Sequence, residues 1–389
     1  MQIIKNGYIH TCENGDIECG YICFDDAKIT ELGQMSDFDE TKYNAPEIID
    51  AQGAHICPGL IDAHCHIGMW EDSMGFEGAD GNEDTDPITP HLRAIDAINP
   101  FDRCFNDALR AGITTVVTGP GSSNVIGGQF AALKTYGKSV DDMLVKAPVA
   151  LKFALGENPK LTYHSKNQTP VTRMGIVALL RETLLKAVEY KNALCEYELN
   201  PHECDKPDYD MKLEALLPLL EREIPAKVHA HRADDIMSAI RLAKEFDIDI
   251  TIEHVTEGNL ICDILKDENL PLMVGPALCE RSKIELRNSS FDNYKALSDA
   301  GLEIAIITDH PVVPIEYLSL CASLAVKNGM AHDAALRAIT INAAKNCGIC
   351  DRVGSLCIGK DADIVIFDKS PLDFYANTLA VWVNGKKVI

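Results

Sequence analysis

The stretch PGLIDAHCHIG, residues 58–68, places His64 and His66 two positions apart, directly after an apolar run. Alternate side chains of a strand point to the same face, so a strand over residues 60–66 would aim both imidazoles into one space. That arrangement suits a pair of metal ligands, although two buried histidines also occur at this spacing by chance. The other strand ends of the chain have to decide between a metal site and a coincidence.

Short apolar or β-branched runs alternate with helix-patterned segments such as FNDALRAG and DDIMSAIRLAKEFD. This alternation predicts a parallel sheet. Eight strands fit a closed (β/α)8 TIM-like barrel of the α/β class better than an open doubly wound sheet, which more often has five or six. The expected strands are 60–66, 114–119, 130–135, 149–155, 226–231, 249–254, 271–276 and 303–309.

The two ends of the chain differ from the middle. Residues 1–57 and 352–389 contain short apolar runs separated by turn signals such as N-G and D-D, which indicate hairpins. Neither end alone is long enough for a stable sheet with a covered face. We therefore expect both ends to form one small β-sandwich domain beside a barrel of residues 58–351.

Composition excludes several classes of partner. The 389 residues include 36 Lys plus Arg against 59 Asp plus Glu, a net charge of −23, which would repel nucleic acid and anionic membranes. No signal segment or membrane-length apolar run is present, so we expect a cytoplasmic chain whose 14 cysteines are reduced thiols. We expect a small-molecule substrate and a homo-oligomer of this chain.

Potential ligands gather at the carboxyl ends of the expected strands, where barrels of this type carry their active sites. The number of imidazole, amine and carboxylate groups at these strand ends is far greater than histidines scattered through a core would give, which favours a metal site. The residues are His64 and His66 on the first strand, Lys152 and Glu157 at the fourth, His229 and His231 on the fifth, His254 on the sixth and Asp309 on the eighth.

The motifs PGLIDAHCH, IEH, TDH and the closing GSLCIGKDADIVIFD together resemble the amidohydrolase superfamily, in particular its imidazolonepropionase-related and prolidase-like metal-dependent hydrolases. The resemblance covers nearly the whole chain but specifies no substrate. It implies a distorted (β/α)8 barrel with a β-sandwich. It also implies one or two divalent metals that activate water for hydrolysis of amides, imines or related bonds.

The resemblance also implies roles for individual residues. His64 and His66 match the ligands of the more buried metal, and His229 and His254 match those of a second metal. Asp309 matches the aspartate that binds metal and moves the proton. His231 is then a residue behind the ligands or a substrate contact, and His310 is a neighbour of the site.

Lys152 and Glu157 decide between one metal and two. In binuclear relatives a lysine carboxylated by CO2 bridges the metals, and LKFAL resembles the segment that supplies it. Glu157 is the rival bridge and otherwise a candidate substrate contact, whereas imidazolonepropionase itself uses one metal. Alternatively, Lys152 points outward between helices.

Zinc is the default ion for such ligands, and manganese, iron or nickel also fit.

The sequence defines the residues that would bind the substrate less clearly than it defines the metal ligands. The Gly- and Ser-rich segment TGPGSSNVIGGQF is either a loop that holds an anionic or amide group with its backbone N–H groups or an ordinary turn-rich connection. Residues 76–100 are long enough for a lid that carries Arg93. The candidate carboxylate clamps at other strand-end loops are Lys160, Arg173, Arg281 and Lys283.

Three functions follow from these observations. The leading hypothesis is a binuclear hydrolase of a small anionic amide or peptide-like substrate, of dipeptidase or prolidase type. The alternative is a mononuclear imidazolonepropionase-like ring-opening hydrolase or a deaminase. A non-catalytic relative is disfavoured because every expected ligand position is filled.

Overall fold

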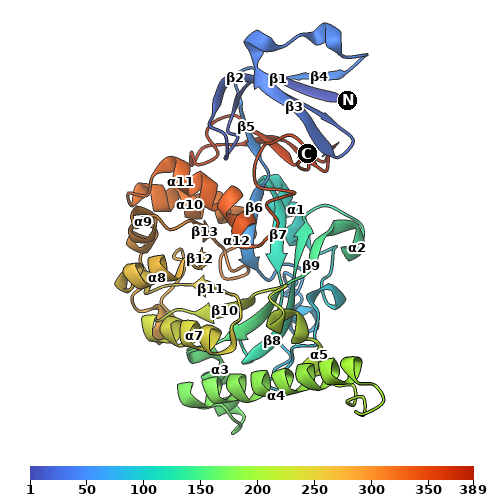
Figure 1. Cartoon of the computed structure of the whole chain (residues 1–389). Coiled ribbons are helices and arrows are strands. Elements are labelled where there is room, and N and C mark those ends of the chain that lie inside the picture. Colours follow the sequence, from blue (N-terminus) through green and yellow to red (C-terminus); the bar gives the residue numbers. More distant parts are fainter.

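The computed structural model describes residues 1–389 and contains two separate sheets (Figure 1). The larger sheet has eight strands that neighbour one another in chain order, as expected for a barrel. Its strands are β6 (Leu60–Cys65), β7 (Ile113–Thr118), β8 (Ile126–Lys134), β9 (Leu144–Ala154), β10 (Ala226–Ala230), β11 (Ile250–His254), β12 (Leu272–Val274) and β13 (Ile304–Ile306).

The barrel is nearly closed, since β13 and β6 form no ladder and meet through backbone hydrogen bonds just beyond the strands. The N–H of Asp309 donates to the carbonyl of His64 at 3.2 Å, and the N–H of His66 donates to the carbonyl of His310 at 2.9 Å. The closure of the barrel therefore lies at the candidate site itself.

The expectation of an all-parallel sheet is wrong at the third strand. Strand β8 starts four residues earlier than the expected 130 and runs antiparallel to both β7 and β9. Residues 119–125 before it contain no helix, and only the four-residue α2 (Val140–Met143) follows it. Such short connections can join antiparallel neighbours, whereas a parallel return needs a crossover of a dozen or more residues.

Helices cover the outside of the barrel, and their apolar spacing explains how they pack. Helix α7 (Ala233–Phe246), for example, buries one apolar stripe at helical spacing, so that this stripe faces the strands. The stripe consists of Ile236, Ala239, Ile240 and Ala243. The other helices are α1 (Arg103–Arg110), α3 (Glu157–Ser165), α4 (Arg173–Leu199), α5 (Met211–Glu214), α6 (Leu217–Leu220), α8 (Cys262–Glu268), α9 (Asp292–Asp299), α10 (Leu318–Lys327), α11 (His332–Ala338) and α12 (Ile341–Asn346), with α7 at Ala233–Phe246.

Both ends of the chain form the second sheet, which lies above the barrel in Figure 1 with both termini in it. Side chains from the two ends share one hydrophobic core, which includes Phe24, Ile56 and Trp382. Its strands are β1 (Gln2–Ile9), β2 (Ile17–Asp25), β3 (Lys28–Gln34), β4 (Glu47–Asp50), β5 (His55–Pro58), β14 (Ile364–Phe367), β15 (Thr378–Val383) and β16 (Lys386–Lys387).

A buried ion cluster joins this sheet to the barrel and explains the acidic residues of the closing motif. Lys134 at the end of β8 is 1% exposed, and its Nζ lies 3.0 Å from Asp361 and 2.5 Å from Asp363. Asp361 also pairs with Lys28 of the small sheet at 2.8 Å. The motif GKDADIVIFD thus carries the contacts that position the two sheets.

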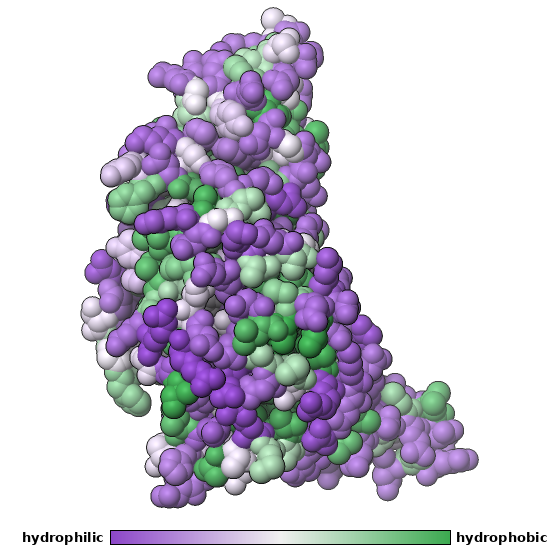
Figure 2. Space-filling model, turned by 90° about the vertical axis from the view of Figure 1, so that its left-hand side faces the viewer, coloured by the Kyte–Doolittle hydropathy of each residue, from purple (hydrophilic) through white to green (hydrophobic).

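The surface is largely hydrophilic on the face that Figure 2 shows. On the face shown in Figure 2, hydrophobic residues lie in small groups among hydrophilic ones. Not one of the helices combines the length and the apolar character that crossing a bilayer would require.

Candidate active site

The first cluster of potential ligands is formed by His64, His66 and Asp309, at the point where the barrel closes. The Oδ1 atom of Asp309 lies 3.4 Å from Nε2 of His64 and 3.1 Å from Nε2 of His66. His66 is oriented by a 2.7 Å hydrogen bond from its Nδ1 to the carbonyl of Gly119. The opening H-x-H and the TDH motif therefore meet in space.

A buried carboxylate that the sequence analysis did not single out lies behind His64. Glu253, on β11 one residue before His254, is fully buried, and its Oε2 lies 3.0 Å from Nδ1 of His64 and 2.9 Å from Nζ of Lys227. A carboxylate beside the outer nitrogen of a ligating histidine fixes the orientation and tautomer of the ring. The signal available in the sequence was a charged residue within the buried strand ITIEH.

Asp62 of the opening motif is also buried and links the two closing strands. Its Oδ1 accepts a hydrogen bond from the N–H of His64 at 3.1 Å, and its Oδ2 accepts from the N–H of Thr308 at 3.2 Å and from the Thr308 hydroxyl. Burial raises the pKa of Asp62 to about 7, against the lowering effect of these donors. The aspartate of PGLIDAHCH thus shapes the backbone that carries both histidines.

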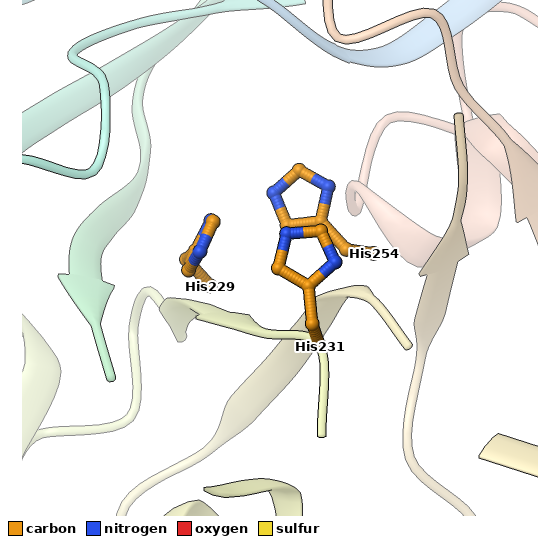
Figure 3. Close-up of side chains that lie close together, drawn as sticks. All are labelled: His229, His231 and His254. Carbon is orange, nitrogen blue, oxygen red and sulfur yellow. The ribbon is translucent and has the colours of Figure 1, made fainter. Parts of the chain in front are cut away.

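The second cluster brings together His229, His231 and His254 (Figure 3). The ring of His254 lies 4.4 Å from each of the other two, centroid to centroid, and is stacked on His231. The Nδ1 atoms of His231 and His254 are held by the Thr256 hydroxyl at 2.7 Å and the Gly275 carbonyl at 2.8 Å. Both histidines of HAH therefore reach the site, which strand spacing predicts.

These three imidazoles are neutral bases at physiological pH. Burial lowers the pKa of His229 and of His254 well below the ordinary value, and it lowers the pKa of His231 to about 3. Neutral imidazoles have a free nitrogen lone pair, which is the form that binds a metal.

Lys152 contacts the first cluster and lines the cavity that the second cluster shares. It is fully buried on β9, its Nζ lies 3.5 Å from Nε2 of His64, and it lines the same cavity as His229. Burial lowers the pKa of this amine to about 8, although Glu253 and Asp309 oppose the shift. The interpretation in which Lys152 points outward between helices is wrong.

Glu157, the rival bridge, lies apart from these ligands. It is the first residue of α3, and its Oε2 accepts a hydrogen bond from the N–H of Glu285 at 3.1 Å. Its side chain does not line the cavity that holds Lys152. Glu285 is a further buried carboxylate that the sequence analysis did not name, because it follows β12 in a segment without a recognisable motif.

A cavity of about 600 Å³ opens over both clusters. Its wall includes Ser122 and Ser123 of the Gly- and Ser-rich segment and Asn82 of the expected lid. The remaining lining residues are His66, Trp70, Gly121, Lys152, Asn158, Leu161, Thr162, His229, His231, His254, Pro276, Cys279, Glu280, Ser282, Lys283, Leu286, Asp309, Pro311 and Val312.

Lys283 is the one candidate clamp among these lining residues. Arg93 pairs with Asp96 at 2.8 Å, and Arg173 pairs with Asp235 at 2.8 Å. Arg281 donates to the carbonyl of Ser289 at 2.7 Å. These three arginines and Lys160 lie outside the cavity lining. The pairing of Arg173 with Asp235, 62 residues away, could not be read from the sequence.

The donor set fits a divalent metal. The hydrogen bonds of His66 and His254 to backbone carbonyls assign a proton to each Nδ1 and leave each Nε2 free. The Nδ1 atom of His229 is buried without a hydrogen-bond partner. Imidazole and carboxylate groups of this kind bind zinc and other transition metals.

Comparisons with known proteins agree with this geometry. The model of the amidohydrolase family matches residues 55–388. The amidohydrolase tasK of Hapsidospora irregularis is 29% identical over 364 residues, which cover 87% of this chain but only 37% of that protein. An imidazolonepropionase of Fusobacterium nucleatum is 23% identical over 412 residues, covering 95% of this chain and 91% of that protein.

A crystal structure of an amidohydrolase from Thermotoga maritima MSB8 superposes with a TM-score of 0.94 at 37% identity, and the match covers 100% of both chains. The family match includes the whole barrel and both ligand clusters. The chain belongs to the amidohydrolase family.

Proposed function

We propose that the protein is a metal-dependent hydrolase that cleaves a C–N bond in a small amide or cyclic amide that carries a carboxylate. Enzymes of this family act on such bonds in small molecules. The observation that carries the proposal is the pair of ligand clusters that share one cavity with the buried Lys152.

Two metal ions fit this arrangement better than one. His64, His66 and Asp309 would hold one ion, and His229 and His254 would hold the other. Lys152 would supply the group shared by both ions, since it contacts His64 and lines the same cavity as His229. A buried ammonium without a close carboxylate partner would be unfavourable. The neutral amine of Lys152 can add to CO2 and release a proton, which gives an anionic carbamate. Zinc is the ion that the histidine-rich donor set favours.

The chain itself supplies the proton transfer. A divalent cation held by these clusters would make water acidic enough to ionise near neutral pH and would polarise the bond under attack. The Oδ1 atom of Asp309 lies 3.1 Å from Nε2 of His66 and 3.4 Å from Nε2 of His64, and a divalent cation bound beside it would keep the carboxylate ionised. Asp309 is therefore ionised, so it can take a proton from the attacking water and return it to the leaving nitrogen.

The side chain of Lys283 is the reason for proposing that the substrate carries a carboxylate. It is a cationic side chain of the cavity wall, near enough for its charge to add to burial in lowering the pKa of His229, and no ion pair joins it to a carboxylate of the protein. A charge-assisted hydrogen bond from Nζ to the substrate would orient the scissile bond over the clusters. Asn82, Ser122 and Asn158 supply neutral polar contacts on the wall.

Replacing Lys283 by Met is expected to raise KM for a carboxylate substrate roughly ten- to a hundredfold, because a hydrogen bond to a charged group is worth about 1.5–3 kcal/mol. The value of kcat should change much less. Steady-state kinetics on the acid and on its neutral amide analogue provide the measurement and its control. An equal loss on both substrates would show that Lys283 does not bind the carboxylate.

The similarity to imidazolonepropionase supports one alternative, a mononuclear ring-opening hydrolase. In that case Lys152 stays an unmodified amine and one cluster holds the only metal. The number of metal ions in each chain separates the two mechanisms.

The function is tested by assaying a panel of N-acyl amino acids, dipeptides and cyclic amides with protein purified without chelator. We expect hydrolysis of at least one compound, loss of activity after chelation, and recovery with Zn²⁺. Elemental analysis of the same preparation should give close to two divalent ions in each chain. Activity that survives complete metal removal would contradict the proposal. A reproducible value near one ion, without an effect of bicarbonate, would favour the mononuclear alternative.

A further inference from the structure

Glu285 lies directly behind the second cluster and is fixed in place. It belongs to a short 3-10 turn, Ile284–Leu286, and is 1% exposed. Its Oε2 accepts a hydrogen bond from the N–H of Glu157 at 3.0 Å, and its own N–H donates to Oε2 of Glu157 at 3.1 Å. This reciprocal pair ties the carboxylate of Glu285 to the first turn of α3.

The other carboxylate oxygen of Glu285 faces the two histidines of β10. Its Oε1 has no hydrogen-bond partner and lies 3.5 Å from Nε2 of His229 and 3.7 Å from Nε2 of His231. A buried carboxylate oxygen without a donor is unfavourable. A shift of about half an ångström would bring either nitrogen to hydrogen-bond distance.

The surroundings of the two rings differ at Nδ1. In His231, Nδ1 lies 2.7 Å from the Thr256 hydroxyl, which can donate to it. In His229, Nδ1 is buried and has no partner. The Asn158 amide also lies 3.5 Å from Nε2 of His229, and its oxygen can face a protonated Nε2. If both rings then carry their proton on Nε2 and turn it toward Glu285, the Nδ1 lone pair of His231 is taken by Thr256 and the Nδ1 lone pair of His229 stays open.

We propose that Glu285 is a positioning residue that selects His229, through its Nδ1 atom, as the metal ligand of the HAH motif and keeps His231 out of the coordination sphere. The inference rests on the proposed metal-dependent function. It assigns different roles to two histidines that strand spacing alone treats as equivalent. It also explains Glu157 as the residue that holds Glu285 in place.

The substitution Glu285→Gln tests this selection with little change in shape. In this variant only the side-chain oxygen of Gln can accept the hydrogen bond from the N–H of Glu157. The side-chain NH2 group would therefore face His229 and His231. His229 would then have to accept at Nε2 and carry its proton on Nδ1, which blocks the ligand lone pair.

Zn²⁺ titration of the metal-stripped full chain by calorimetry is the measurement. Loss of a carboxylate that orients a ligating histidine typically weakens metal binding 10–100-fold. We expect Glu285→Gln to weaken one equivalent of Zn²⁺ by that factor, with the melting temperature of the metal-free chain unchanged. The control is Glu257→Gln, since Glu257 is a nearby buried carboxylate that accepts from Ala233 N and Asn288 Nδ2 and contacts neither ring of the HAH motif.

A second pair of variants makes the test independent of how Glu285→Gln folds. His229→Ala should lose one equivalent of Zn²⁺, whereas His231→Ala should keep it. Equal losses in these two variants, wild-type affinity in Glu285→Gln, or an equal loss in the Glu257→Gln control would each overturn the inference. Absence of Zn²⁺ binding in the wild type would instead overturn the proposed function, and the inference with it.

Discussion

Asp309→Asn is expected to lower kcat by a factor of roughly 10²–10⁴, the usual contribution of a general base, while the protein keeps its metal. The amide has the size of the carboxylate and still offers an oxygen to a metal, but it cannot accept the proton of the attacking water. The measurement is turnover of a compound that the wild type hydrolyses, together with metal content for both proteins.

Metal content is the control that gives this result its meaning. The histidines of both clusters remain in the variant, so most of the binding should persist. Turnover within a few-fold of the wild type, with the metals retained, would show that Asp309 is not the proton shuttle. If the variant loses metal, its rate is compared after saturation with Zn²⁺, and full recovery would have the same meaning.

Lys134→Met is expected to reduce the free energy of unfolding by roughly 3–5 kcal/mol, because it leaves the buried carboxylate of Asp363 without its cation. Asp361 keeps its ion pairs with Lys28 and Arg352. Asp361 and Asp363 both lie within 3.0 Å of the Lys134 amine, and both are buried. Urea unfolding monitored by circular dichroism would show the effect as a lower midpoint.

Lys28→Met is the matched control, since Lys28 pairs with the same Asp361 but its side chain is half exposed. An exposed pair contributes roughly 0–1 kcal/mol, so this variant should unfold close to the wild type. Similar midpoints for Lys134→Met and wild type would refute the view that the buried cluster holds the two sheets together.

The sequence predicted the order of the barrel strands but not the direction of one of them. Apolar runs show where a strand lies, and both directions bury the same side chains. The direction of β8 depends on its short connections, residues 119–125 and α2, which lack a crossover helix. The pairing of both chain ends into one sheet was predictable because neither end could cover a sheet alone.

The candidate site was predictable where its residues end strands. Their side chains converge because the carboxyl ends of barrel strands meet at one face. Glu253 and Glu285 were missed because a carboxylate behind a histidine has no fixed spacing from it. Arg93 and Arg173 were expected near the substrate because the sequence could not show that Asp96 and Asp235 pair with them.

The small sheet has a consequence for the order of events during synthesis. Strand β5 pairs with β14, so that Pro58 lies opposite Ile364, near the other end of the chain. Every barrel strand lies between these partners, and the ribosome therefore releases the barrel before β5 can acquire its second neighbour. Contacts between residues so far apart form slowly, because a long loop must be closed first. Until β14 is synthesised, β5 has an open edge of unpaired backbone groups, so this strand of the nascent chain is exposed to mispairing with another copy.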